Sequence, residues 1–226
     1  MVGDAAMTLD ARTEIFARIR AALRTSVASG PAYAAAIELS RLATADVAST
    51  ESLAARFARE LEAVGGETVI VSETGIDALA RTVADRVARL GYHAIAVQGE
   101  IFAMHAASRI PATQLIDISG ISVDRLEKAD CAIIAAESLI ADSGSAVVRL
   151  ATYEERLLPY LPPVCIIVGQ SAQLTARLDD AALLAGDDER GERVIITGPS
   201  RTADIEKTVV LGAHGPGSLT VIIAAV

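Results

Sequence analysis

The pattern of apolar and polar positions divides the chain into a short irregular N-terminal part and a long regular part. Residues 8–24 carry apolar side chains at helical spacing with Arg and Glu on the other side, which predicts an amphipathic helix. Residues 25–48 have scattered apolar side chains without a sustained period and predict a long connector. We therefore expect an N-terminal helix and connector arm over residues 1–48, a candidate contact with another subunit.

After this arm the pattern switches repeatedly between the helical and the strand period. Leu53, Phe57, Leu61 and Val64 recur at intervals of three and four positions and predict a helix that a pair of glycines ends. Further helices are expected at residues 75–90, 100–109, 123–129 and 172–184, and strands at residues 67–71, 93–97, 114–118, 131–136, 164–168, 193–197 and 219–224. This alternation predicts one α/β domain over residues 49–226 with a doubly wound, mostly parallel sheet.

Residues 137–150 break the regular alternation. They predict two short strands around a hairpin turn at residues 142–144, so we expect a mixed sheet. Residues 186–191 are polar and charged and predict a solvated loop or a mobile flap. Residues 219–224 are expected to close the sheet.

Composition narrows the classes of partner. The 226 residues include 20 basic and 29 acidic side chains, which gives a net charge of −9 without basic clusters. A protein that binds nucleic acid needs clustered Lys and Arg, and the low aromatic content offers few rings for base stacking. We therefore predict no nucleic-acid partner.

Cysteine and histidine positions give no sign of a metal or cofactor. Cys131 and Cys165 lie in apolar runs without CxxC spacing, which indicates buried, unreactive thiols. His93, His105 and His214 show no metal-ligand spacing with them, so we predict no metal, iron–sulfur cluster or other cofactor in this chain. No run is apolar enough for a secretory signal or a membrane span, which predicts a cytoplasmic protein.

A turn followed by polar residues near the C-terminal end is the first candidate site. Gly198 permits a sharp exit from the preceding strand, and Pro199 fixes the turn. Ser200 or Thr202 is expected to cap a helix that begins near Arg201. Exposed amides at a helix start attract anions, and a guanidinium adds a bidentate contact to a phosphate or carboxylate, so this loop is a candidate anion site.

A purely structural role for this loop is the alternative. In that interpretation Ser200 and Thr202 only cap, and Arg201 forms an ion pair with Asp204 or Glu206 that stiffens the loop.

A second glycine-rich break lies a few residues later. His214 stands between Gly212 and Gly215, which allow a backbone to approach a ligand closely. An imidazole there is a candidate acid or base near neutral pH, and a hydrogen bond to a backbone carbonyl is the alternative. We expect the two loops to converge at the ends of neighbouring strands and to form a site.

Glu137 is the third candidate, because it directly follows the apolar run at residues 131–136. If the strand ends there, the carboxylate points into a crevice and is available as a base or nucleophile.

These C-terminal residues resemble the LUD-domain family, in particular its lactate-utilisation protein C type. The motifs GPSRTADIE, at residues 198–206, and LGxHGP, at residues 211–216, carry the resemblance together with LPPV at residues 161–164. It implies a three-layer α/β/α fold similar to the NagB/RpiA/CoA-transferase group, with a site at the carboxyl ends of the strands. It also implies a role in the oxidation of lactate to pyruvate beside iron–sulfur partner proteins. On this basis the candidate ligand-binding residues are Gly198, Ser200, Arg201, Thr202, Asp204, Gly212 and Gly215.

Two motifs depart from the family pattern. The AETGT of similar sequences reads AESLI here, so Glu137 is present without the neighbouring Thr and Gly. The LPPVH of the family ends in Cys165 instead of an imidazole. These changes put close approach of a ligand to Glu137, and any chemistry of the missing histidine, in question.

Three functions remain open from the sequence. The first is an accessory, non-cluster subunit of lactate oxidation that binds a small anionic metabolite. The second is a stand-alone sugar-phosphate isomerase or CoA-transferase-like enzyme that uses Glu137. The third is a regulatory module whose ligand controls association, either with other proteins or as a homo-oligomer.

Overall fold

The computed structural model of the chain describes residues 13–18, 20–21, 51–184, 191–203, 209–212 and 215–225. The chain divides into two units, Met1–Ser49 and Thr50–Val226. In the first unit, residues 13–18 and 20–21 are helical, and Ile15 and Phe16 are exposed. The remainder of the expected N-terminal helix, and the connector that follows it, lie outside the described residues, as does most of the loop expected at residues 186–191.

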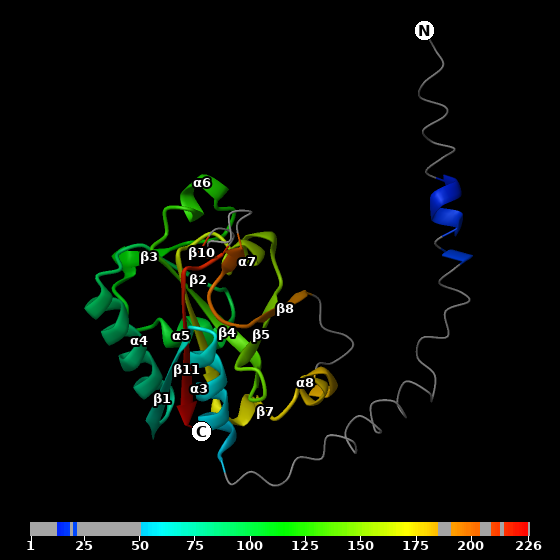
Figure 1. Cartoon of the computed structure of the whole chain (residues 1–226). Helices are drawn as coiled ribbons and strands as arrows, with labels where there is room; N and C mark the ends of the chain where they lie inside the picture. Colours follow the sequence, from blue (N-terminus) through cyan, green and yellow to red (C-terminus); the bar gives the residue numbers. More distant parts are fainter. Residues whose placement is uncertain are drawn as a thin grey trace. The chain divides into compact units, whose positions relative to one another are not determined.

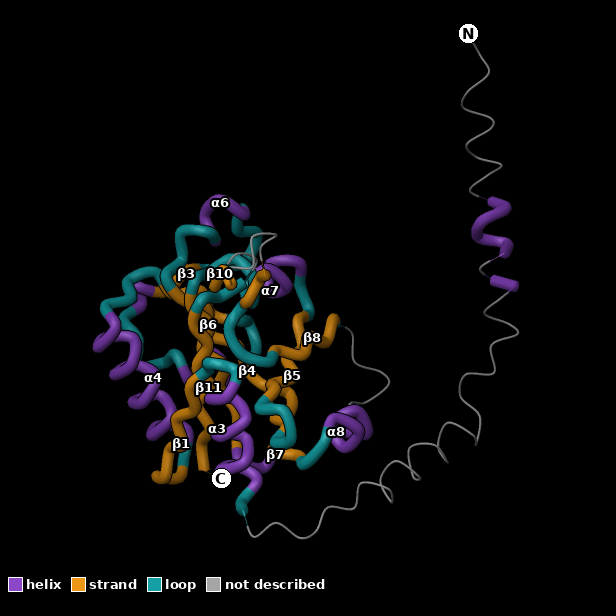
Figure 2. The backbone as a smooth tube through the Cα atoms, in the orientation of Figure 1, coloured by secondary structure: helices purple, strands orange, loops and turns teal. Residues whose placement is uncertain are grey.

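The second unit is built on a mixed, mostly parallel sheet (Figure 1). Its described strands are β1 Glu67–Thr74, β2 Ile95–Val97, β3 Leu115–Ile116, β4 Cys131–Ile140, β5 Ser145–Leu150, β6 Val164–Gln170, β7 Leu174–Thr175, β8 Glu192–Ile196 and β11 Ser218–Ala225. The main path has the order β1-β11-β6-β4-β2-β3, and every pair along it is parallel. β5 pairs antiparallel with β4 and with β8 (Figure 2). The predicted α/β class with a mostly parallel mixed sheet is confirmed.

Helices cover both faces of this sheet. The described helices of the unit are α3 Leu53–Ala63, α4 Ile76–Leu90, α5 Ile101–Ala106, α6 Val123–Leu126, α7 Tyr153–Leu157 and α8 Leu178–Leu184. On one face Ile133 of β4 packs in a core with α4 and α5, and on the other face Ile134 packs with α3 and α6. Strands buried on both faces require continuous apolar runs, which explains the Val- and Ile-rich segments of the sequence. No described helix is both long enough and apolar enough to cross a membrane.

Local signals set several of these boundaries. The Ser52 hydroxyl accepts a hydrogen bond from the Ala55 amide at 3.2 Å and caps α3, whose Phe57 and Leu61 are buried. α4 ends at Gly91, which has φ 70° and adopts the left-handed conformation that favours glycine. The hairpin turn after β4 is confirmed, and at Gly144, with φ 60°, an added Cβ would lie 2.3 Å from the Leu61 amide nitrogen.

Three expectations about the helices and strands are wrong. β4 does not end before Glu137 but continues to Ile140, because the following residues are buried and pair with β5. The helix expected at residues 172–184 begins only at Leu178, since the preceding residues form a 3-10 turn and β7, which pairs with β4. β11 does not close the sheet but lies between β1 and β6.

The connections after β2 and β3 leave toward opposite faces. After β2 the chain enters α5, whose Ala103 and Ala106 pack in the core with α4. After β3 it enters α6, whose Leu126 packs in the core with α3. Along the order β1-β11-β6-β4-β2-β3, the connection of β2 leads outward to β3, whereas that of β4 leads the other way to β6. The topological switch point therefore lies between β2 and β4, at whose carboxyl ends α/β proteins commonly bind ligands.

Candidate functional site

The two C-terminal motifs lie side by side. The Ser200 amide donates to the Pro216 carbonyl oxygen at 2.8 Å, and the Gly212 amide donates to the Ser200 carbonyl oxygen at 2.9 Å. Gly215 is buried against the same residue, because an added Cβ would lie 3.1 Å from Ser200 Cβ. We refer to the described residues 198–201, 212 and 215–217 as the motif junction.

The helix expected near Arg201 is absent from the described residues that follow the turn. Instead, β9 Arg201–Ala203 pairs antiparallel with β10 Val209–Leu211 in a separate two-stranded sheet. The β-branched residues Thr202, Val209 and Val210 favour an extended backbone. The pairing of β9 with β10 provides hydrogen-bond partners for backbone N–H and C=O groups of this segment. The prediction that Ser200 or Thr202 caps a helix is therefore wrong.

Gly198 sets the turn into the junction, as predicted. It has φ 81°, and an added Cβ would lie 2.8 Å from Val64 Cγ2. The turn therefore depends on glycine both for its backbone conformation and for its contact with the residue that ends α3.

Arg201 carries the positive charge of the junction. Its side chain is exposed, and Nη2 donates to the carbonyl oxygen of Val64, the C-cap residue of α3. A guanidinium has five N–H donors, so this hydrogen bond does not exhaust it. The cation also lies at the negative end of a helix dipole, where it is stabilised.

Several predicted site residues lie outside the described part of the junction. Asp204, Glu206 and His214 are not described, and Thr202 is described by its backbone alone. Their proposed contacts with Arg201 or with a ligand stay predictions.

The motif junction lies at the amino ends of three parallel strands. The amides of Gly217 and Ser218 donate to the Pro163 carbonyl oxygen at 2.9 and 3.3 Å, directly before β6 and β11 begin. Val64, which Arg201 contacts, precedes β1. The junction is therefore at the opposite end of the sheet from the carboxyl ends at which the resemblance implies a site.

Glu137 lies within β4 and not at a strand end, so its expected position is corrected. The Arg193 guanidinium donates to both carboxylate oxygens, Nε to Oε2 at 2.7 Å and Nη2 to Oε1 at 3.0 Å. Arg149 Nε lies 3.7 Å from Oε1. The register of β4 with β5 shifts at this point, and the carboxylate ties β4 to β5 and β8. Neither arginine was predicted as a partner of Glu137, although each is a charged residue within a largely apolar strand.

Two buried polar side chains near the carboxyl end of β2 were also missed. Gln98 is 2% exposed; its Nε2 donates to the Arg149 carbonyl oxygen at 2.6 Å, and its Oε1 accepts from the Ala135 amide at 2.9 Å. Glu155 is 6% exposed and accepts from the Gly99 amide at 3.1 Å. The spacing of Thr152 and Glu155 is a capping box, which the sequence offered as a signal.

The cysteines are buried, as predicted. Burial raises the pKa of the Cys131 thiol to about 12 and also raises the pKa of Cys165. Both thiols are therefore protonated near neutral pH and poor nucleophiles. Within the described ranges, no group of three or more His, Cys, Asp or Glu side chains is arranged to hold a metal ion.

Comparison with known proteins places these features in a family context. The profile of the LUD domain matches residues 54–224. Lactate utilization protein C of Geobacillus thermodenitrificans (strain NG80-2) is 33% identical over 101 residues, 42% of this chain and 42% of that protein. Lactate utilization protein C of Halalkalibacterium halodurans is 34% identical over 100 residues, 42% and 44% of the two chains. Uncharacterized protein YkgG of Escherichia coli (strain K12) is 33% identical over 101 residues, with the same coverage of 42% and 44%.

These alignments span less than half of each curated relative. A crystal structure of a DUF162 family protein from Deinococcus radiodurans matches with a TM-score of 0.52 and 16% identity, covering 76% of this chain and 96% of that one. At this identity the likeness shows the fold alone.

Proposed function

Because this chain belongs to the LUD domain family, we propose that it acts as an accessory subunit in the oxidation of lactate to pyruvate and binds a small anionic ligand at the motif junction. Relatives named lactate utilization protein C support the pathway. The coverage of those relatives is partial, so the role is proposed for this chain and not transferred to it.

One observation carries the site. Hydrogen bonds join the Ser200 segment to Gly212 and Pro216, and the exposed guanidinium of Arg201 stands next to this join. Gly212 is exposed, so a ligand can approach its backbone, while a charge-assisted contact from Arg201 favours a carboxylate or phosphate. The proposed ligand-binding residues are Gly198, Ser200, Arg201, Thr202, Asp204, Gly212 and Gly215, with His214 as the proposed acid or base.

The redox chemistry of the proposed system belongs to partner proteins. An iron–sulfur cluster is held by several thiolates, whereas both cysteines of this chain are buried and protonated. We therefore propose association with iron–sulfur proteins, and a homo-oligomer as a further assembly.

A stand-alone isomerase or transferase that uses Glu137 is the competing prediction. Such an enzyme needs a carboxylate that is available to a substrate carbon or acyl group. Both oxygens of Glu137 accept from Arg193, which uses one lone pair on each oxygen and fixes the carboxylate between β4 and β8. This ion pair favours a structural role for the residue. Turnover by the purified chain alone, abolished in a Glu137→Gln variant, would establish the enzyme instead.

Isothermal titration calorimetry on the full chain tests the anion site. Lactate, pyruvate and inorganic phosphate are titrated into the unchanged protein and into Arg201→Ala, Arg201→Lys and Arg81→Ala variants. Arg81 is an exposed arginine paired with Glu73 far from the motif junction, so it is the matched control. At least one anion is expected to bind, with affinity about tenfold lower in Arg201→Ala, lower to a smaller extent in Arg201→Lys, and unchanged in the control.

Thermal unfolding of the same variants separates binding from folding, because Arg201 also contacts the end of α3. Equal anion affinity in the unchanged protein and a folded Arg201→Ala variant would remove the site from the proposal.

A further inference from the structure

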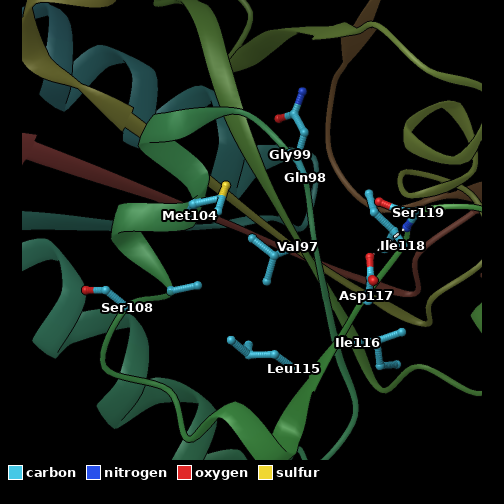
Figure 3. A pocket seen from close by; sticks show the side chains of 11 residues that line it. Val97, Gln98, Gly99, Met104, Ser108, Leu115, Ile116, Asp117, Ile118 and Ser119 are labelled. Atoms are coloured by element: carbon cyan, nitrogen blue, oxygen red, sulfur yellow. Dashed lines mark hydrogen bonds between the residues drawn. The ribbon is translucent and has the colours of Figure 1, made fainter.

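A cavity opens at the carboxyl ends of β2 and β3, the end of the sheet opposite the motif junction (Figure 3). Its volume is about 420 Å³, within the range of small-molecule sites. β2 and the turn after it, α5, and β3 with the loop after it all contribute to its lining. The cavity therefore lies at the carboxyl end of the sheet, beside the switch point between β2 and β4, in the region where α/β proteins commonly bind ligands.

The lining of the cavity is mainly apolar. Figure 3 shows Val97 of β2, Met104 of α5 and Leu115 of β3 around one space. Met104 is 56% exposed and Leu115 is 37% exposed, although both side chains are large and apolar. A ring compound lying between them would bury this surface, and the hydrophobic effect would favour its binding.

Charge at the cavity is negative. Among the side chains that line it, Asp117 alone is charged, and its Oδ1 accepts from the Ser119 amide at 2.9 Å (Figure 3). This carboxylate is exposed at the end of β3 and accepts hydrogen bonds from hydroxyl or N–H groups of a ligand. A ligand carboxylate or phosphate beside it would be repelled.

Backbone amides after β2, which hold phosphate in many nucleotide-binding α/β proteins, already bind carboxylates of this chain. The Gly99 amide donates to Glu155 at 3.1 Å. The amides of Phe102 and Ala103 donate to Glu100 Oε2 at 2.7 and 3.1 Å. A phosphate in this position would have to displace two carboxylates, and it would face a third at Asp117.

We propose that this cavity binds an uncharged ring compound that carries hydroxyl or N–H groups, of the kind found in nucleosides, and discriminates against the phosphorylated form of the same compound. The apolar walls bind the ring, Asp117 accepts from its polar edge, and the carboxylates of Glu100 and Glu155 exclude the phosphate. This site is separate from the anion site at the motif junction and does not depend on it.

Two pairs of probes that differ by one phosphate test this selectivity on the full chain. Adenosine is compared with AMP, and riboflavin with FMN, by equilibrium dialysis at fixed ionic strength. The uncharged member of at least one pair is expected to bind, and its phosphorylated partner is expected to bind at least about tenfold more weakly.

Three variants locate the binding. Met104→Gln and Asp117→Asn are expected to weaken the uncharged probe by about fivefold to tenfold. Ile101→Gln changes an exposed apolar residue on the same helix that does not line the cavity, so it is the matched control and should bind like the unchanged protein. Because these three side chains are exposed, the variants are expected to fold, which circular dichroism checks.

Three outcomes would overturn the inference: no binding of either uncharged probe, equal or tighter binding of the phosphorylated forms, or the same loss in Ile101→Gln as in Met104→Gln. None of them bears on the Arg201 titration, so this inference and the proposed function fail independently.

Discussion

The two ends of one parallel sheet differ in the groups that they present to a ligand. At the amino ends of β1, β6 and β11, glycine turns meet beside the exposed Arg201. At the carboxyl ends of β2 and β3, apolar side chains surround a cavity, and the nearby amides are bound to Glu100 and Glu155. At the end that usually receives anions in this class of fold, the amides are thus bound to carboxylates of the protein itself.

This difference shows that the direction of the strands does not by itself determine which kind of ligand each end of the sheet binds. Free amides at strand ends attract anions only while no side chain of the protein binds them first. Here a glutamate from α7 and one at the start of α5 occupy them. Anion recognition is therefore proposed for the other end, where Arg201 supplies the charge.

Among the variants that compare the two ends of the sheet, removal of the Glu155 carboxylate is expected to change stability most. Glu155→Ala leaves the amides of Gly99 and Ala151 without their described partner and removes the capping box of α7. Because the Glu155 side chain that makes these contacts is buried, we expect the free energy of unfolding to fall by about 3 kcal/mol. Urea denaturation measures the change.

Glu155→Gln is the matched variant, since it keeps an acceptor oxygen but removes the charge. It should cost less stability and reduce the preference of the cavity for uncharged probes. A change below about 0.5 kcal/mol in Glu155→Ala, the size typical of surface substitutions, would show that this carboxylate does not hold the carboxyl-end turn.

A methyl group at Gly198 is expected to have the next largest effect, at the amino end. Gly198→Ala combines an unfavourable positive φ with a Cβ only 2.8 Å from Val64 Cγ2, so we expect a loss of about 2 kcal/mol. The variant should also weaken anion binding at the motif junction while leaving probe binding in the cavity unchanged.

Gly91→Ala provides the control, because Gly91 has φ 70° but open space around an added Cβ. It reports the backbone cost alone, about 1 kcal/mol. Thermal unfolding of the two variants side by side measures the contact with Val64; equal losses would mean that this contact contributes nothing.

The smallest expected effect concerns Arg86, a second arginine near the amino ends of the strands, which differs from Arg201 in being paired with a carboxylate. Arg86 is buried, and its Nη1 donates to Glu67 Oε1 at 2.7 Å, so this cation already has a carboxylate. The hydrogen bond from Arg86 lowers the pKa of Glu67 below its ordinary value of 4.5. Since Glu67 is half exposed, the pair is expected to contribute about 0.5–1 kcal/mol.

A lowered pKa in the folded state fixes the direction of the pH dependence. The contribution of Glu67 is fully present above pH 4.5, the ordinary value, and is lost as pH falls through the lower folded value. Urea denaturation of the unchanged protein and of Glu67→Gln should therefore differ at pH 7 and converge toward pH 3. Glu73→Gln, at a carboxylate that is 74% exposed, is the control and should show a smaller difference. A gap that widens on acidification would contradict the assignment.

Local pattern was sufficient for the class of fold and for the main elements. Buried runs such as the one at residues 131–136 predicted inner strands, and the helical spacing of Phe57 and Leu61 predicted α3. The hairpin turn and the buried cysteines were also predicted, because each follows from the character of a few neighbouring residues. The C-terminal motifs were sufficient to indicate the LUD family.

Tertiary structure alone decided where those motifs lie and which groups their neighbours bind. The sequence indicated Glu137 as a candidate but not its partner Arg193, which is 56 positions away. Arg193 comes close only because β5 pairs with both β4 and β8. The sequence also indicated Gly198 and Gly215, but only the pairing of β11 between β1 and β6 placed them at the amino ends. Periodicity reports which face of an element is buried, whereas strand order depends on contacts between distant segments, which no local pattern encodes.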